Sequence, residues 1–162
     1  PPPPPPVFGP PFATSLPMFG DLTNSGAIPT LAAALRFAGQ RQKVIAHNIA
    51  NIATPNFIQK DVSVADFRET LARAVDDRRA ETGGRSGPLP IADTDEVQVD
   101  ASGKITLHPE TPSGGILFHD KNNRDLERLM QDSVENAAFY RMNVDLLRTR
   151  FEMLKVAITQ RP

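Results

Sequence analysis

Histidines are the side chains of this chain with which acid–base or metal chemistry would most readily begin. They are His47, His108 and His119, and none belongs to a His-Glu-x-x-His pair of the kind that binds zinc from one helix. They lie in separate segments, with no partner acid or nucleophile at a spacing that would bring the two together. We interpret each histidine as a structural residue.

Two acidic groups offer a second chemical possibility. One is the pair Asp76-Asp77, and the other combines Asp93, Asp95 and Glu96. Carboxylates bind hard cations and exchange protons. Both groups lie in polar stretches, where solvated carboxylates are the ordinary case, so we do not interpret them as a site.

Neither the glycine pairs nor the cysteine content of the chain indicates a site. Gly83-Gly84 and Gly114-Gly115 lack the preceding strand and following helix of a phosphate-binding loop. Cysteine is absent, which excludes disulfides, thiolate catalysis and cysteine-ligated zinc or iron–sulfur sites. The sequence therefore predicts no catalytic residue, no cofactor and no metal.

The charge balance limits the classes of partner that the chain can bind. The 162 residues include 18 Lys and Arg against 19 Asp and Glu, and the basic residues are spread along the chain. A nucleic-acid-binding surface needs a basic patch, so we expect no nucleic-acid partner. No apolar run approaches the roughly 20 residues of a membrane span, and the sequence predicts neither a transmembrane segment nor a secretory signal.

The elements that would position any site begin after a proline-rich stretch. Residues 1–27 have a composition that favours polyproline II and cannot pack a core, so we expect a disordered extension there. Met18 opens a plausible native start just before the first segment with a helical pattern. We divide the rest of the chain into an N-terminal segment (residues 28–57), a middle segment (58–121) and a C-terminal segment (122–162).

An apolar pattern in residues 28–57 predicts the first helix, from about Ile28 to Ile52. Apolar residues recur at alternating spacings of four and three, as in a helix that packs against another helix. The helix should stop before Thr54, because Pro55 disfavours helical backbone in the residue ahead of it. The positions are Leu31, Leu35, Ala38, Gln42, Ile45, Ile49 and Ile52, of which only Gln42 is polar.

The same pattern is longer in residues 122–162, where it predicts a helix from Asn123 to about Gln160. Asn122 or Asn123 can cap its start, and about 35 residues of helix would be about 50 Å long. Only Ser133 interrupts the apolar row. The positions are Leu126, Met130, Ser133, Ala137, Tyr140, Val144, Leu147, Phe151, Leu154 and Ile158.

The middle segment, residues 58–121, carries weaker signals. Ser63 with Asp66 is a capping signal for a short helix bearing Phe67, Leu71 and Val75. The glycine- and proline-rich stretch 81–90 is typical of a flexible loop. We expect this segment to be loop-rich and poorly packed.

Four alternating apolar residues after that loop indicate a small β-hairpin. They are Val97 and Val99 before a Ser-Gly turn, and Ile105 and Leu107 after it. An isolated two-stranded hairpin is marginally stable in water. We therefore expect it to pack against a neighbouring element.

A motif at the end of the first predicted helix resembles the N-terminal signature of the flagellar rod, hook and hook-associated axial proteins. That signature reads Asn-Ile-Ala-Asn, a short gap, then Thr-Pro, glycine and an aromatic residue. Asn56 replaces the usual glycine, and asparagine is the common substitute where a left-handed turn is needed. The motif residues are Asn48, Ile49, Ala50, Asn51, Thr54, Pro55, Asn56 and Phe57.

Within this family, the C-terminal segments 122–127, 135–137 and 151–158 resemble one subunit of the proximal rod. Lys121 replaces a usual glycine there, and Arg124 stands where valine is common. The sister rod subunit FlgC is the alternative within the family. A stand-alone coiled-coil adaptor, or an enzyme with a site in the middle segment, are the alternatives outside it.

The resemblance implies a mainly α-helical fold in which the long N- and C-terminal helices pair as an antiparallel coiled coil. It implies a structural subunit without catalysis, which self-associates in the periplasmic rod of the flagellar basal body and transmits motor torque for motility. It also implies export through the flagellar type III apparatus. The implied partners are the rod proteins FlgC, FlgF and FlgG, together with FliE and the MS ring.

On this interpretation, function lies in surfaces rather than in a pocket. A chain with long apolar seams and a loop-rich middle gains part of its stability from neighbouring subunits. The predicted assembly seam is Leu31, Leu35, Ile45, Ile49, Leu126, Val144, Leu147, Phe151 and Leu154. The predicted turn after the first helix is formed by Asn48, Asn51, Thr54, Pro55 and Phe57.

Overall fold

The protein is mainly helical, with one small sheet. The computed structural model describes residues 26–100, 103–111 and 126–159. Its helices are α2 (Ile28–Ala50), α3 (Val64–Thr82) and α4 (Leu126–Thr159), and its strands are β1 (Val97–Val99) and β2 (Ile105–Leu107). Four predictions lie outside the described residues: the extension before residue 26, the cap at Asn122 or Asn123, the pair Gly114-Gly115, and His119.

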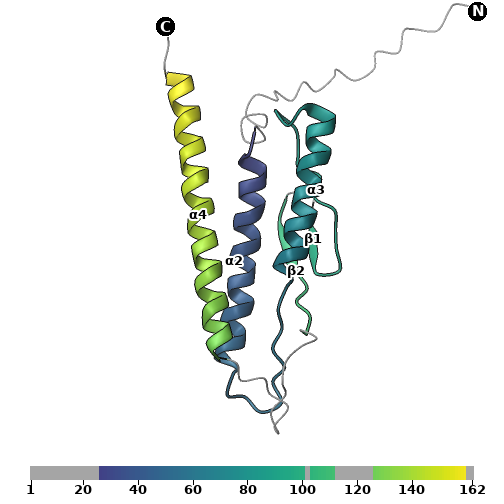
Figure 1. Ribbon diagram of the computed structural model, residues 1–162, viewed down its shortest axis with the longest axis vertical. Coiled ribbons are helices and arrows are strands. Elements are labelled where there is room, and N and C mark those ends of the chain that lie inside the picture. The colour runs from purple at the N-terminus through teal and green to yellow at the C-terminus, as the bar shows by residue number, and fades with distance from the viewer. Residues whose placement is uncertain (1–25, 101–102, 112–125, 160–162) are drawn as a thin grey trace, which may run out of the picture.

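Helix α2 is the central element of the described chain. It lies between α4 on one side and α3 with the hairpin on the other (Figure 1). Helix α4 runs beside α2 in the opposite direction and extends past the end at which α2 begins. The expected fold class, mainly α with a small hairpin, is confirmed.

The ends of α2 follow from local chemistry. Pro29 lies in its first turn, where the N–H that proline lacks would have no helical partner in any case. The helix ends at Ala50, and the backbone N–H of Asn51 donates to the carbonyl of His47 at 3.2 Å. The prediction that the helix stops before Thr54 is confirmed.

Helix α3 begins as predicted and ends later than predicted. The Ser63 hydroxyl accepts the N–H of Asp66 at 3.1 Å and caps its start. The helix then runs for 19 residues to Thr82 and ends at Gly83, whose φ of 66° is left-handed. The prediction of a short helix is therefore wrong, and so is the expectation that residues 81–82 belong to a loop. Arg78, 4% exposed, holds the last turns in place by donating to the carbonyl of Gly26 at 2.7 Å.

The hairpin forms as predicted. Strands β1 and β2 are antiparallel, with Val97 opposite Leu107 and Val99 opposite Ile105. Val97 and Ile105 are buried and face the core, and the other two are half-buried. The hairpin packs against a neighbour, as expected, because its apolar side chains join those of α2 and α3.

The hydrophobic core lies between α2, α3 and the hairpin. At its centre the rings of Phe37 and Phe67 stack with their centroids 3.9 Å apart and their planes 3° from parallel. The expectation of a poorly packed middle segment is therefore wrong. The expectation was wrong because α2 has a second apolar face outside the predicted seam. The scattered apolar residues of the middle segment pack against this face. The buried members of this core are Ala33, Phe37, Val62, Phe67, Val97 and Ile105.

Removal of the Ser63 side chain tests whether it caps helix α3. Ser63→Ala should lower the free energy of unfolding by about 1 kcal/mol, because the N–H of Asp66 loses its acceptor. Urea unfolding followed by far-ultraviolet circular dichroism measures the change. Ser63→Thr keeps a hydroxyl and should stay close to the unaltered chain. Equal losses in the two variants would show that the hydroxyl does not cap the helix.

Candidate assembly interface

The family motif lies at the end of α2 and reverses the chain. The N–H of Thr54 donates to the carbonyl of Asn51 at 2.9 Å, and the N–H of Phe57 donates to the carbonyl of Thr54 at 3.2 Å. Asn56 has a φ of 60°, in the left-handed region where asparagine substitutes for glycine. The left-handed turn expected from that replacement is confirmed.

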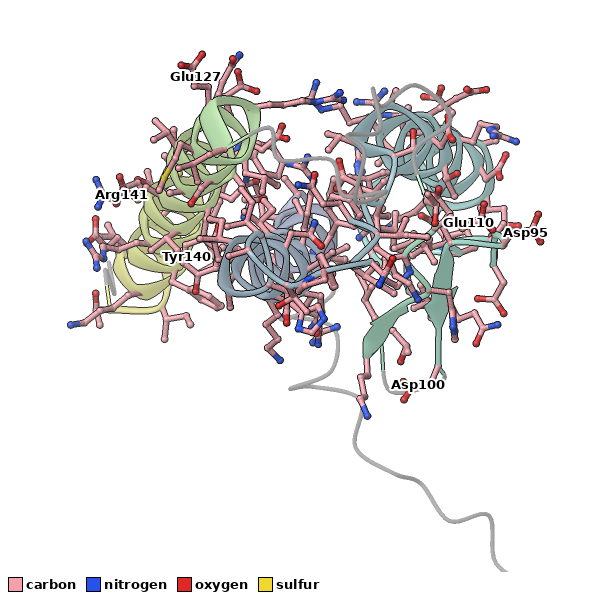
Figure 2. All side chains as sticks on the ribbon, turned by 90° about the horizontal axis from the view of Figure 1, so that it is seen from below. Asp95, Asp100, Glu110, Glu127, Tyr140 and Arg141 are labelled. Atoms are coloured by element: carbon pink, nitrogen blue, oxygen red, sulfur yellow. The ribbon has the colours of Figure 1, made fainter. Side chains whose placement is uncertain are left out.

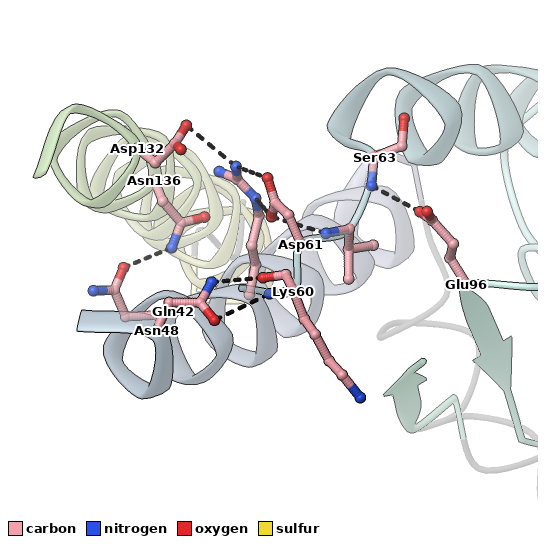
Figure 3. Close-up of polar contacts among 10 residues, drawn as sticks. Gln42, Asn48, Lys60, Asp61, Ser63, Glu96, Asp132 and Asn136 are labelled. Carbon is pink, nitrogen blue, oxygen red and sulfur yellow. Dashed lines mark hydrogen bonds and ion pairs between the residues drawn. The ribbon is translucent and has the colours of Figure 1, made fainter. Parts of the chain in front are cut away.

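Asn48 ties the returning chain to α2. Its side chain is buried, its Nδ2 donates to the carbonyl of Lys60 at 2.6 Å, and its Oδ1 accepts the N–H of Lys60 at 3.2 Å (Figure 3). The amide therefore satisfies both polar groups of one residue's backbone. This pairing holds the segment after the turn alongside α2 and brings Asp61 next to Arg41.

Two further contacts brace the turn near its surface. Nδ2 of Asn51 donates to the carbonyl of His47 at 2.9 Å, which occupies an acceptor at the helix end. The rings of His47 and Phe57 meet edge to face with centroids 5.5 Å apart. These contacts agree with our interpretation of His47 as a structural residue.

A cluster of polar side chains joins α2, the returning segment and the start of α4. Arg41 is 7% exposed and lies between two carboxylates (Figure 3). Its Nη2 is 3.2 Å from Oδ2 of Asp61 and 3.4 Å from Oδ1 of Asp132, and its Nε donates to Oδ1 of Asp61 at 3.3 Å. A buried guanidinium is costly unless its charge is paired and its donors are bonded. The two carboxylates pair the charge and accept hydrogen bonds from Nε and Nη2.

The same cluster continues along α4 with uncharged groups. Nδ2 of Asn136, a buried side chain, donates to the carbonyl of Ala38 at 3.0 Å and to Oε1 of Gln42 at 2.8 Å. Nε2 of Gln42 donates to Oγ of Ser133 at 3.1 Å. Gln42 and Ser133 are the two polar interruptions of the two apolar patterns, and the fold places them against each other. We call Arg41, Gln42, Asp61, Asp132, Ser133 and Asn136 the polar cluster.

The residues of the predicted assembly seam have different exposures in the single chain. Ile45 is buried. Leu126 and Phe151 are 43% and 47% exposed in the single chain. The half-buried members are Leu31, Leu35, Ile49, Val144, Leu147 and Leu154. Of the remaining motif residues, Ala50, Thr54 and Pro55 are exposed.

The buried face of α4 includes three residues that lie outside the predicted pattern. They are Leu129, Asn136 and Asn143, spaced by seven, each directly before one of the pattern positions Met130, Ala137 and Val144. Sequence reasoning missed this face because two of the three side chains are asparagines. A signal was present in the repeat itself, since asparagine at positions seven apart on a helix marks one face.

The other faces of α4 are unusually apolar for an exposed helix. After Asn143 the helix has no buried residue. Charged side chains lie among the apolar ones, and Figure 2 shows Arg141 on the side of α4 that faces away from α2. The large apolar residues exposed on α4 are Leu126, Met130, Val134, Tyr140, Met142, Leu146, Phe151, Met153, Val156 and Ile158.

Three of the five acidic side chains considered at the outset have structural partners. Asp76 pairs with Arg79 at 3.3 Å, and Oδ1 of Asp93 accepts the N–H of Val99 at 2.8 Å. Glu96 accepts the N–H of Ser63 at 2.7 Å. Across residues 26–100, 103–111 and 126–159, His, Asp and Glu form no group of three that would hold a metal ion. No helix within those ranges combines the length and the apolar character of a membrane span.

Known proteins resemble the chain over most of its length. No protein-family model matches it. The flagellar basal body rod protein FlgB of Bacillus subtilis is 32% identical over 136 residues, which cover 83% of this chain and 95% of that protein. The chain belongs to the FlgB family. FlgB of Salmonella typhimurium is 31% identical over 114 residues (70% of this chain and 79% of that protein), and FlgB of Borrelia hermsii is 28% identical over 123 residues (73% and 84%).

Membership of the FlgB family makes this chain a structural subunit of the flagellar basal-body rod. It confirms the resemblance inferred from the motif at Asn48 to Phe57. It also favours FlgB over the sister subunit FlgC and over a stand-alone adaptor, as the C-terminal segments indicated. For a FlgB-family subunit, the surfaces described above are candidate contacts with neighbouring subunits.

Proposed function

We propose that this chain polymerises in the proximal rod of the flagellar basal body and carries motor torque through its helices, without catalysing a reaction. The observation that carries the proposal is the number of large apolar side chains exposed along α4 in a chain whose relatives are rod proteins. Exposed apolar patches mark interaction surfaces. In the rod, neighbouring subunits would cover these side chains.

The assembled form we propose has α2 and α4 paired as an antiparallel coiled coil. The two helices already run side by side in opposite directions (Figure 1). The seam residues on α4, among them Val144, Leu147 and Phe151, then contact α2 and the next subunit together. Contacts of this head-to-tail kind generate a helical assembly rather than a closed pair.

Membership of the FlgB family supports a proposal for the partners and the export route. We propose that the neighbours are further copies of this chain and the rod proteins FlgC, FlgF and FlgG, with FliE and the MS ring at the base. The rod lies in the periplasm, and the subunit reaches it through the flagellar type III apparatus. An unfolded passage suits a chain whose C-terminal helix has few buried residues to unpack.

A pair of adjacent substitutions tests the seam. Leu147 is half-buried and lines a groove of about 670 Å³ with Ile28 and Phe151. Leu147→Asp should abolish swimming, because a carboxylate without a partner is costly to bury when a neighbour closes the groove. Swimming of cells that carry only the altered gene measures assembly, and secretion of the subunit is checked separately.

The matched control is Arg148→Asp on the next position. The Arg148 side chain is 69% exposed and pairs loosely with Asp145 at 3.8 Å. Exposed ion pairs of this kind contribute little, so cells with this variant should swim. If Leu147→Asp supports swimming as well as the unaltered gene does, this face of α4 is not an assembly seam.

A further inference from the structure

We infer that the polar cluster, rather than the apolar seam, sets the register of α4 on α2. We infer further that the motif turn after α2 contributes to this register, because it places Asp61 beside Arg41. Register here means which residues of α4 lie opposite a given turn of α2. The inference concerns the fold of the single chain. Its test is therefore independent of whether the rod assembles as proposed.

The apolar residues of α4 do not distinguish one register from another. They repeat every seven residues, as in the series Met130, Ala137, Val144, Phe151 and Ile158. A shift of one heptad moves the helix by about 10 Å and again places apolar residues opposite apolar residues. The register must therefore be specified by groups that do not repeat.

The polar cluster is such a group, because each one-heptad shift breaks part of it. A shift in one direction puts Phe139 in the place of Asp132, and the Arg41 guanidinium then loses its acceptor on α4. A shift in the other direction brings Asp125 to that place but puts Leu129 where Asn136 lies. The carbonyl of Ala38 and Oε1 of Gln42 then lose the side-chain donor that α4 supplies. Single buried polar groups are known to fix register in helix pairs in this way.

The turn after α2 contributes to the register of α4 through Asp61. This residue faces the Arg41 guanidinium with both carboxylate oxygens, and its Oδ1 also accepts the N–H of Val62 at 2.8 Å. The Asn48 pairing with Lys60 fixes the position of the neighbouring backbone. Arg41 is thereby oriented before α4 arrives, with Nη2 placed for Asp132 (Figure 3). In Arg41, Asp61 and Asp132 we identify positioning residues for α4.

Engineered cysteine pairs report the register, because the chain has no cysteine of its own. Gln42→Cys with Ser133→Cys reports the observed register, since the two side chains are in contact there, with Nε2 and Oγ 3.1 Å apart, and a short thiol-reactive cross-linker can join them. Gln42→Cys with Tyr140→Cys, or with Leu126→Cys, reports the two shifted registers. The ratio of observed to shifted cross-link is measured in the full chain, and every further substitution is compared within the same cysteine variants, because Gln42 and Ser133 belong to the polar cluster.

Asp132→Leu should lower this ratio roughly tenfold, because the observed register loses a charge-assisted contact. Asp61→Leu should lower it in the same direction while leaving α2 and α4 unchanged. Asp132→Glu keeps the acceptor and should stay within about twofold of the unaltered chain. Asp145→Leu is the matched control, since Asp145 is an exposed carboxylate of the same helix, and it should leave the ratio unchanged.

Three results would overturn the inference. An unchanged ratio in Asp132→Leu would show that apolar packing sets the register. An unchanged ratio in Asp61→Leu would remove the role of the turn. Loss of helical circular dichroism in Asp132→Leu, whose side chain is replaced at a 24% exposed position, would make the cluster a source of stability rather than of register.

Discussion

Phe37→Ala is expected to lower the free energy of unfolding by about 3–5 kcal/mol, which is a large part of the stability of a domain of this size. The ring of Phe37 is 1% exposed and stacks on Phe67 at the centre of the core. Its removal leaves a cavity between α2, α3 and the hairpin, and all three elements lose a shared contact. Urea unfolding followed by circular dichroism measures the loss.

The control for this prediction is Phe151→Ala. It removes the same atoms from a side chain that is 47% exposed on α4. In the isolated chain it should cost well under half as much, because most of the ring already faces water. If the two variants lose similar amounts of stability, the core does not lie where the stacked rings place it.

Asn48→Leu is expected to cost about 2–4 kcal/mol although the two side chains have the same branched arrangement of heavy atoms. The amide of Asn48 bonds both the N–H and the carbonyl of Lys60, and leucine leaves two partly buried backbone groups without partners. Each such group costs about 1–3 kcal/mol. The same unfolding measurement tests the expectation, and amide hydrogen exchange at Lys60 tests its cause.

Asn51→Leu supplies the comparison within the same turn. Asn51 donates to the carbonyl of His47 at an exposed helix end, where water replaces the lost donor. We expect a loss of about 1 kcal/mol or less. A larger loss for Asn51→Leu than for Asn48→Leu would mean that the turn, rather than the pairing with Lys60, carries the stability of this motif.

Much of the secondary structure was predictable because its signals are local. Pro55 just after the first apolar pattern, the Ser63 cap and the alternation around the hairpin are signals that each involve residues a few positions apart. The length of α3 was not predictable in this way. It depends on Arg78, which reaches the carbonyl of Gly26, 52 residues earlier in the chain. Local patterns do not contain such contacts.

The candidate interface was predictable in its motif and less so in its helix face. The motif predicted the turn and its left-handed residue, because the asparagine at position 56 readily adopts left-handed backbone angles. The face of α4 that meets α2 contains Asn136, and hydrophobic periodicity treats an asparagine as solvent-facing. What keeps it buried is its pair of acceptors on α2, the carbonyl of Ala38 and the side chain of Gln42. These acceptors are known only once the fold is.

The long sequence separation between α2 and α4 has a kinetic consequence. Arg41 meets Asp61 across 20 residues, whereas it meets Asp132 across 91, and Asn136 reaches Ala38 across 98. Closing the larger loops costs about 1 kcal/mol more in chain entropy, and contacts of high sequence separation slow folding. The core of α2, α3 and the hairpin can thus form while α4 is still undocked. A newly folding subunit would then expose its C-terminal helix to a neighbour during the interval before that helix docks on its own α2.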